Sequence, residues 1–160
     1  MSISESRDEF PVAESDEFYI RRAIALAEQA EAVGDVPIGA LLVSGDLVLE
    51  AKNEKEFRPD ATAHAEMLLL REAARRLGVW RLSDATMYVT KEPCVMCAGA
   101  IVAARVKRVV YGCPDPKGGA AGSVVDVLRH PSLNHQVEVT SGVLSDETAA
   151  QLQAFFRKRR

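Results

Sequence analysis

The sequence predicts an α/β fold in which one central sheet is covered by helices on both faces. Segments with strand periodicity alternate with segments of helical spacing, in the order helix, hairpin, helix, strand, helix, strand, strand, helix. Strand–helix–strand connections are right-handed and favour parallel pairing, so we expect the third, fourth and fifth strands to be largely parallel. A length of 160 residues suits one domain with a buried core.

The first half of the chain is expected to form a helix, a hairpin and a second helix. Gly34 and Gly78 each follow a segment of helical spacing, where glycine commonly ends a helix. The dipeptide Gly45-Asp46 separates two apolar runs and indicates a tight turn. The expected bounds are 16–33 for the first helix, 38–44 and 47–52 for the strands, and 62–77 for the second helix.

The second half is expected to alternate strands and helices around a glycine-rich loop. Pro93 opens a helix, because proline is favoured at the first helical position. The last helix has acidic residues in its first turn and basic residues in its last, which matches the helix dipole. The expected bounds are strands at 86–90, 106–111 and 136–140, helices at 93–104 and 145–159, and a loop at 112–122.

The composition is that of a globular protein, with 48% apolar and 27% charged residues, and it excludes a disordered or fibrous chain. Residues 1–15 are acidic and polar and lack the order of a signal peptide, so we expect a flexible segment followed by a single domain at 16–160. No apolar run is long enough to span a membrane, and we expect a cytoplasmic protein. The net charge of −3 argues weakly against a generic nucleic-acid binder.

Two short motifs carry the chemistry: H-A-E at 64–66 and P-C-V-M-C at 93–97. Each is weak alone, since a lone histidine is usually a packing residue and a C-x-x-C pair can be a redox disulfide. Together, His64, Cys94 and Cys97 offer one imidazole and two thiolates, a ligand set that suits zinc. Three protein ligands leave a fourth position for water, as in a catalytic rather than a structural zinc site.

Glu66 turns this ligand set into a prediction of an enzyme. It lies two positions after His64, where it need not bind the same metal. A carboxylate beside a zinc-bound water can accept its proton and later deliver it. The pattern H-x-E followed by P-C-x-x-C resembles the signature of zinc-dependent nucleobase deaminases.

Longer stretches resemble the bacterial tRNA-specific adenosine deaminases, which convert the wobble adenosine of an arginine tRNA to inosine. The resembling stretches are 35–43, 61–74, 87–112, 118–135 and 144–160. The resemblance implies a three-layer α/β/α cytidine deaminase-like fold with a five-stranded mixed sheet. It also implies one zinc ion per subunit, a homodimer, and the anticodon stem-loop of a tRNA as partner.

The same resemblance implies roles for residues outside the two motifs. Asn53 would contact the nucleoside, Val36 and Pro37 would line its pocket, and Asp115 would lie near a sugar. The residues implied to contact the RNA backbone are Lys117, Arg157, Lys158, Arg159 and Arg160. Two positions depart from the family pattern: Lys91 stands where an apolar residue is expected, and Gly118 where threonine is common.

Several alternatives stay open at this point. Asn53 and Asp115 could be turn residues, and the basic end could be a solvated, dipole-matched helix terminus. A deaminase of a free base or nucleotide, of the guanine or cytosine type, would carry the same zinc motif. A non-catalytic zinc module that binds RNA would fill all four ligand positions. A thioredoxin-like protein would instead form a Cys94–Cys97 disulfide.

Overall fold

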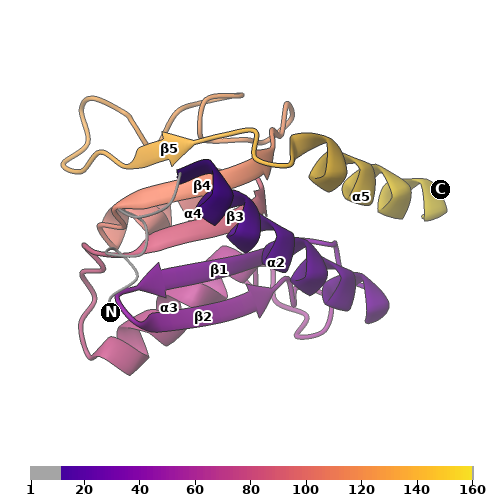
Figure 1. The fold of residues 1–160 in the computed structure, drawn as a ribbon, viewed down its shortest axis with the longest axis horizontal. Coiled ribbons are helices and arrows are strands. Elements are labelled where there is room, and N and C mark those ends of the chain that lie inside the picture. Colours follow the sequence, from indigo (N-terminus) through magenta and orange to yellow (C-terminus); the bar gives the residue numbers. More distant parts are fainter. Residues whose placement is uncertain (1–11, 160) are drawn as a thin grey trace.

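The computed structural model describes residues 12–159, which form one sheet between two pairs of helices (Figure 1). In chain order the elements are α2 (Val12–Ala32), β1 (Gly39–Ser44), β2 (Leu47–Lys52), α3 (Ala65–Leu77), β3 (Thr86–Lys91), α4 (Val95–Ala103), β4 (Arg108–Cys113), β5 (Glu138–Thr140) and α5 (Ser145–Lys158). None of the helices among these residues is long and apolar enough to cross a membrane.

The sheet has the strand order β2-β1-β3-β4-β5. Strand β1 is antiparallel to both β2 and β3, whereas β3, β4 and β5 are parallel, which confirms the predicted mixed sheet and its parallel half. The start of β1 therefore lies beside the ends of β2 and β3, and β4 ends at the same edge. The segments that carry the predicted site residues lie at these strand ends, on the side of the sheet where β1 starts and β2, β3 and β4 end. We call this side the site edge.

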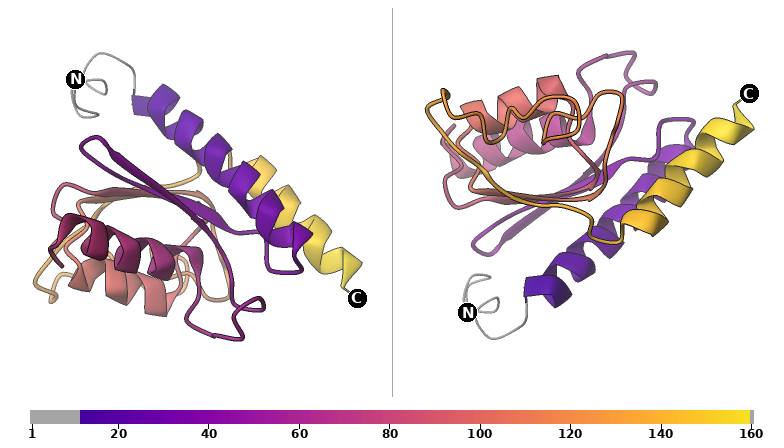
Figure 2. Two further views of the ribbon diagram at one scale, coloured as in Figure 1. Left: turned by 90° about the horizontal axis from the view of Figure 1, so that it is seen from below. Right: turned by 90° about the horizontal axis from the view of Figure 1, so that it is seen from above.

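The helices cover the sheet in two layers, with α3 and α4 on one face and α2 and α5 on the other (Figure 2). Side chains alternate between the faces, as the strand period requires. Leu42 and Val89 join the larger core beneath α3 and α4, while Leu41 and Tyr88 join the smaller core beneath α2. The expected three-layer α/β/α fold is confirmed.

Helices α2 and α5 run side by side in the same direction (Figure 2). Arg21 pairs with Glu147 at 3.1 Å near the start of α5, and Lys158 Nζ lies 3.4 Å from Glu31 near its end. Between them, Gln151 Nε2 donates to the carbonyl oxygen of Ile24. These contacts place the last turn of α5 beside the end of α2, at the site edge.

Helix α2 is anchored at both ends of its contact with the sheet. Asp16 is buried and accepts two hydrogen bonds from Arg108 at 2.8 and 3.0 Å, at the start of β4. At the site edge, Gly39 touches α2 so closely that a Cβ there would lie 2.1 Å from the carbonyl oxygen of Ala23. Only glycine permits this approach.

Several boundaries differ from the sequence prediction by a few residues. Helix α2 begins at Val12 rather than 16, and the expectation for residues 1–15 falls mainly outside the described residues. Helix α3 begins at Ala65 rather than 62, because the Asp60 carboxylate holds the backbone and hydroxyl of Thr62 in a turn. Strand β4 runs over 108–113 instead of 106–111.

The prediction that Pro93 opens a helix is wrong. Helix α4 begins at Val95, and Cys94 is its N-cap with φ −76° and ψ 176°. Pro93 precedes this cap, and its carbonyl oxygen accepts a hydrogen bond from the backbone N–H of Ala120. The residue therefore links the glycine-rich loop to the start of α4 instead of starting the helix.

Candidate active site

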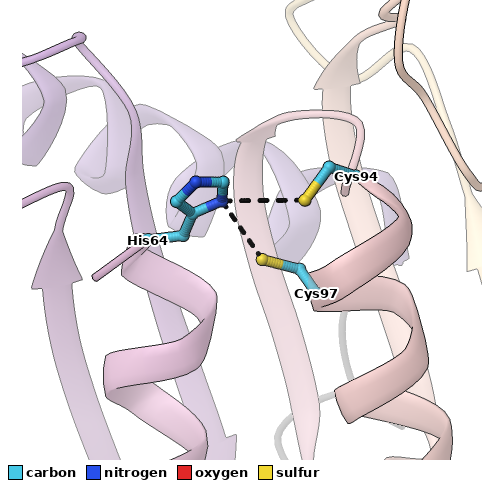
Figure 3. Close-up of side chains that lie close together, drawn as sticks. All are labelled: His64, Cys94 and Cys97. Atoms are coloured by element: carbon cyan, nitrogen blue, oxygen red, sulfur yellow. Dashed lines mark hydrogen bonds between the residues drawn. The ribbon is translucent and has the colours of Figure 1, made fainter. Parts of the chain in front are cut away.

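The three predicted metal ligands meet at the site edge (Figure 3). His64 Nδ1 lies 3.4 Å from Cys97 Sγ and 3.7 Å from Cys94 Sγ. Tetrahedral zinc with usual bond lengths would place such nitrogen and sulfur atoms about 3.6 Å apart. The two distances and the donor types therefore fit a shared zinc ion.

The ligands are held by the first residues of two helices. His64 and Cys94 are the N-caps of α3 and α4, and Cys97 lies in the first turn of α4. Asn53, which follows β2, is buried and accepts a hydrogen bond from the Ala65 backbone N–H at 2.9 Å. This bond caps α3 from outside the helix and fixes the backbone next to His64.

The pKa values of the three side chains are shifted in different directions by their mutual contacts. A hydrogen bond from Cys97 is the main cause that lowers the pKa of Cys94 to about 3, and His64 adds to it. The same bond raises the pKa of the Cys97 thiol, and the Cys94 thiolate raises the pKa of His64. Helix N-termini also favour thiolates. Cys94 is therefore held as a thiolate, which is the form of cysteine that binds a metal ion.

Within residues 12–159, no other histidine, cysteine or carboxylate belongs to this ligand group. Cys113 is buried with its Sγ 3.7 Å from the carbonyl oxygen of Thr90. His135 Nε2 contacts the carbonyl oxygen of Val106 at 2.7 Å, and His130 Nδ1 accepts a hydrogen bond from the Ser132 backbone. The described part of the chain thus offers three ligands rather than the four of a structural zinc site.

Glu66 lies in the first turn of α3, directly beside the ligand group. Its side chain is buried, with 4% of the residue exposed. Burial raises the pKa of this carboxyl group, while its backbone hydrogen bond and the neighbouring His64 act in the opposite direction. A buried carboxyl group that holds a proton more readily than usual is suited to accept and return one during a reaction.

Sequence reasoning missed Glu92, the residue immediately before Pro93. Glu92 is 2% exposed, and its carboxylate accepts hydrogen bonds from the Asp115 backbone at 3.0 Å, from Ala121 and Ser123 backbones at 2.9 and 3.1 Å, and from the Ser123 hydroxyl. A Cβ on Gly119 would lie 2.3–2.5 Å from this carboxylate, so only glycine fits there. The sequence signal that could have indicated this contact is an acidic residue directly before the P-C-V-M-C motif, together with the glycine-rich loop at 112–122.

Glu92 ties the loop after β4 to the metal ligands. Its four hydrogen bonds come from residues 115–123, and Gly119 forms a backbone bridge with Cys94. The loop that the sequence predicts to contact the sugar is therefore fixed to the segment that carries two of the three ligands.

The structure brings the other predicted pocket residues to the same edge. Val36 is partly buried and Pro37 is buried, just before β1. Asp35 joins this segment to the residues after Asn53, because its carboxylate accepts hydrogen bonds from the backbones of Val36 and Glu56 at 2.9 and 2.8 Å. Val36, Pro37 and Asn53 thus lie on the β1–β2 side of the ligand group.

Asp115 caps a tight turn after β4. Its Oδ1 accepts hydrogen bonds from the backbones of Lys117 and Gly118 at 3.0 and 3.2 Å, and Lys91 Nζ lies 3.1 Å from its Oδ2. Burial raises the pKa of Asp115, but these bonds and Lys91 outweigh that effect and lower it. Lys91, one of the two departures from the family pattern, is therefore paired with a predicted substrate residue.

A wide hollow of about 880 Å³ opens where this turn meets α5. We call it the basic hollow, and its lining residues are Lys91, Asp115, Lys117, Gln153, Phe156, Arg157 and Arg159. Of the predicted RNA-contacting residues, Lys158 lies elsewhere, because it pairs with Glu31 on α2. Arg160 lies outside the described residues.

Comparisons with known proteins identify the family of this chain. The family model of the MafB19-like deaminases matches residues 14–160. A tRNA-specific adenosine deaminase of Bacillus subtilis is 51% identical over 146 residues, covering 91% of each chain. One from Haemophilus influenzae is 46% identical over 150 residues, covering 92% of this chain and 87% of its own.

A solved structure shares the fold. It comes from a study of A-to-I editing by tRNA:A34 deaminases at the wobble position, and it superposes with a TM-score of 0.80 at 42% identity. The match covers 84% of this chain and 99% of the other. The chain therefore belongs to the MafB19-like deaminases by its family model, and to the tRNA-specific adenosine deaminases by its identity to these relatives.

Proposed function

We propose that this protein hydrolyses the wobble adenosine of a tRNA anticodon to inosine and releases ammonia. The observation that carries the proposal is the open His64–Cys94–Cys97 group with the buried Glu66 beside it. The identity to relatives named tRNA-specific adenosine deaminase supports the choice of substrate. Because tRNA is the substrate, the proposal implies that the protein works in the cytoplasm.

We assign one zinc ion per subunit to the ligand group. Nitrogen and sulfur donors in a tetrahedral spacing favour zinc over magnesium or calcium, which prefer oxygen ligands. Bound there, zinc would supply a water of lowered pKa, and hence a nucleophile at neutral pH.

Glu66 moves the protons of the reaction. Its carboxylate accepts the proton of the attacking water, delivers it to a ring nitrogen of the adenine, and then carries the second water proton to the leaving amine. Water adds to the amino-bearing carbon, the carbon–nitrogen bond breaks, and the products are inosine and ammonia. Burial of Glu66 keeps bulk water from competing for these protons.

The base would enter between the two halves of the site edge. Val36, Pro37 and Asn53 line one side, and the turn at Asp115 lies on the other, next to the sugar. Because His64 and Cys94 are partly buried and Cys97 is fully buried, the target nucleotide has to leave the base stack to reach them, as in other enzymes that act on a single base.

The basic hollow favours RNA over a free base as substrate. It combines the cations of Lys117, Arg157 and Arg159 with Phe156, a residue that is 47% exposed. Cations for the backbone and an exposed aromatic ring for stacking are the usual elements of a single-strand binding surface. A free base would use neither of them.

A homodimer is part of the proposal. Val95 and Val124 are 58% and 54% exposed and adjoin the bridge between Cys94 and Gly119. A second copy that covers this apolar surface would remove it from water and shield the ligand group. Light scattering on the purified protein would show a mass of two chains if this assignment is right.

The deciding experiment offers the protein a synthetic anticodon stem-loop with adenosine at the wobble position, and in parallel free guanine, cytidine and adenosine. We expect inosine in the stem-loop only. Turnover of free compounds without turnover of the stem-loop would replace the proposal by a free-base or nucleoside deaminase. RNA binding without ammonia release from any substrate would indicate a non-catalytic module.

A further inference from the structure

Lys91 brings a positive charge to a place where the two motifs and their mechanism require none. It is the last residue of β3, three positions before Cys94. Its side chain is 26% exposed and its partner Asp115 is 17% exposed, so the pair lies half-buried in the wall of the basic hollow. A charge in such a position interacts more strongly with its surroundings than one in open solvent.

The two oxygens of Asp115 have different partners. Oδ1 is bound by the backbone N–H groups of Lys117 and Gly118, while Lys91 approaches Oδ2. Gly118 leaves the space beside Oδ2 open. A Cβ at that position would lie only 3.3 Å from Oδ2 and would crowd it. Lys91 therefore has access to the one side of the carboxylate that the turn does not use.

The pair also sets the net charge of the basic hollow. The wall contains the four cations of Lys91, Lys117, Arg157 and Arg159, and one carboxylate, that of Asp115. With Lys91 in place, Asp115 is neutralised and three positive charges remain. Without Lys91, an unpaired carboxylate would face the phosphates of an approaching RNA strand and reduce the surplus to two.

We propose that Lys91 is a positioning residue for the RNA substrate, which it serves by neutralising and orienting Asp115 so that a phosphodiester next to the target nucleotide binds in the basic hollow. The inference rests on the proposed function. Lys91 acts through Asp115, and the phosphate is held by Lys117 and the arginines of α5. Chemistry at the ligand group does not depend on this pair.

The test compares Lys91→Leu, Lys91→Arg, Asp115→Asn and the double variant Lys91→Leu/Asp115→Asn in steady-state deamination of the anticodon stem-loop. For Lys91→Leu we expect KM to rise roughly three- to tenfold, with kcat within about twofold of the parent. The increase should shrink at high salt, where the exposed charges of the hollow are screened. Lys91→Arg, which keeps the charge, should stay close to the parent protein.

The double variant tests whether Lys91 acts through Asp115. Asparagine still caps the turn but carries no charge, so adding Asp115→Asn to Lys91→Leu should lower KM again. If Lys91 and Asp115 acted on the substrate independently, the free-energy losses of the two single variants would add in the double variant. Lys107→Leu is the matched control, because it removes the same charge at the opposite edge of the sheet, and it should leave KM unchanged.

The inference fails if Lys91→Leu leaves KM unchanged, or if it lowers kcat, zinc content and melting temperature together, which would make Lys91 a structural residue. Additive losses in the double variant would also overturn it. Parent protein that makes no inosine from the stem-loop would overturn the proposed function itself, so the two failures are separate.

Discussion

The ligand group and the basic hollow share one edge of the sheet, but they are built differently. His64, Cys94, Cys97 and Glu66 come from the first turns of two helices and are partly or fully buried. The hollow is exposed and combines the end of β3, the turn after β4 and the last turns of α5. The two regions meet through Glu92, which precedes the cysteines and holds the loop.

This difference separates chemistry from substrate selection. The buried region needs a few residues at fixed spacing, because helix starts place them with little freedom. The exposed region needs a charge distribution, which several combinations of loop and helix residues could supply. Variants of the first region should therefore change kcat or metal content, and variants of the second should change KM and its response to salt.

The largest effect is expected from removing a metal ligand. Cys97→Ala should leave the protein with little zinc and no measurable deamination, because the nucleophile is generated at the metal. Metal analysis and inosine formation measure the two losses. Cys113→Ala removes a buried thiol outside the ligand group and should retain the metal. Full activity in metal-free Cys97→Ala would contradict the assignment of the site.

Glu66→Ala should separate metal binding from turnover. Zinc content should stay near that of the parent protein, since Glu66 is not in the ligand group. The rate of inosine formation should fall by about 10²–10⁴-fold, the usual contribution of general acid–base catalysis. A Glu66→Ala protein that loses its zinc would show that this carboxylate supports the ligands instead.

Glu92→Gln should weaken the connection between the two regions. An amide cannot accept all four hydrogen bonds, and the loss should cost about 1–3 kcal/mol of unfolding free energy and raise KM as the loop loosens. The melting temperature and the kinetics of the stem-loop reaction measure both effects. Unchanged values would show that the backbone bridge between Cys94 and Gly119 is sufficient to hold the loop.

The effect of Glu92 should also depend on pH. Burial raises the pKa of its carboxyl group, but the hydrogen bonds outweigh burial and lower the pKa below its ordinary value. A lowered folded-state pKa means that the stabilisation is present above the ordinary carboxyl pKa and is lost as the pH falls through the folded value. The difference in melting temperature between parent and Glu92→Gln should therefore be largest near neutral pH and shrink in acid.

The smallest effect is expected on the last turn of α5. Arg157→Gln should weaken binding of the stem-loop a few-fold and flatten its salt dependence by about 0.7 in the log–log slope, as for one lost contact with a single strand. Lys158→Gln is the control, since Lys158 pairs with Glu31 on the other side of the helix. Equal slopes for both variants would remove Arg157 from the RNA surface.

The sequence predicted the element order, the parallel half of the sheet and the meeting of His64, Cys94 and Cys97. Periodicity is a local property, and the motifs H-A-E and P-C-V-M-C can each be recognised from a few consecutive residues. The predicted first residue of α4 was wrong. The preference of proline for helix starts does not reveal that the Pro93 carbonyl oxygen accepts a hydrogen bond from Ala120. Glu92 was missed for the same reason, because its four donors lie 23–31 residues away. The position of Lys158 likewise depends on how α5 packs on α2, which no short motif encodes.

The anchoring of α2 has a practical consequence for engineering. The pair between Asp16 and Arg108 holds the beginning of α2 at the start of β4. The ligand group lies at the opposite ends of the strands. Arg157 and Arg159, at the far end of the chain, line the basic hollow. A fluorescent protein or targeting module fused ahead of α2 should leave the RNA entrance clear, whereas the same module fused behind α5 would stand in it.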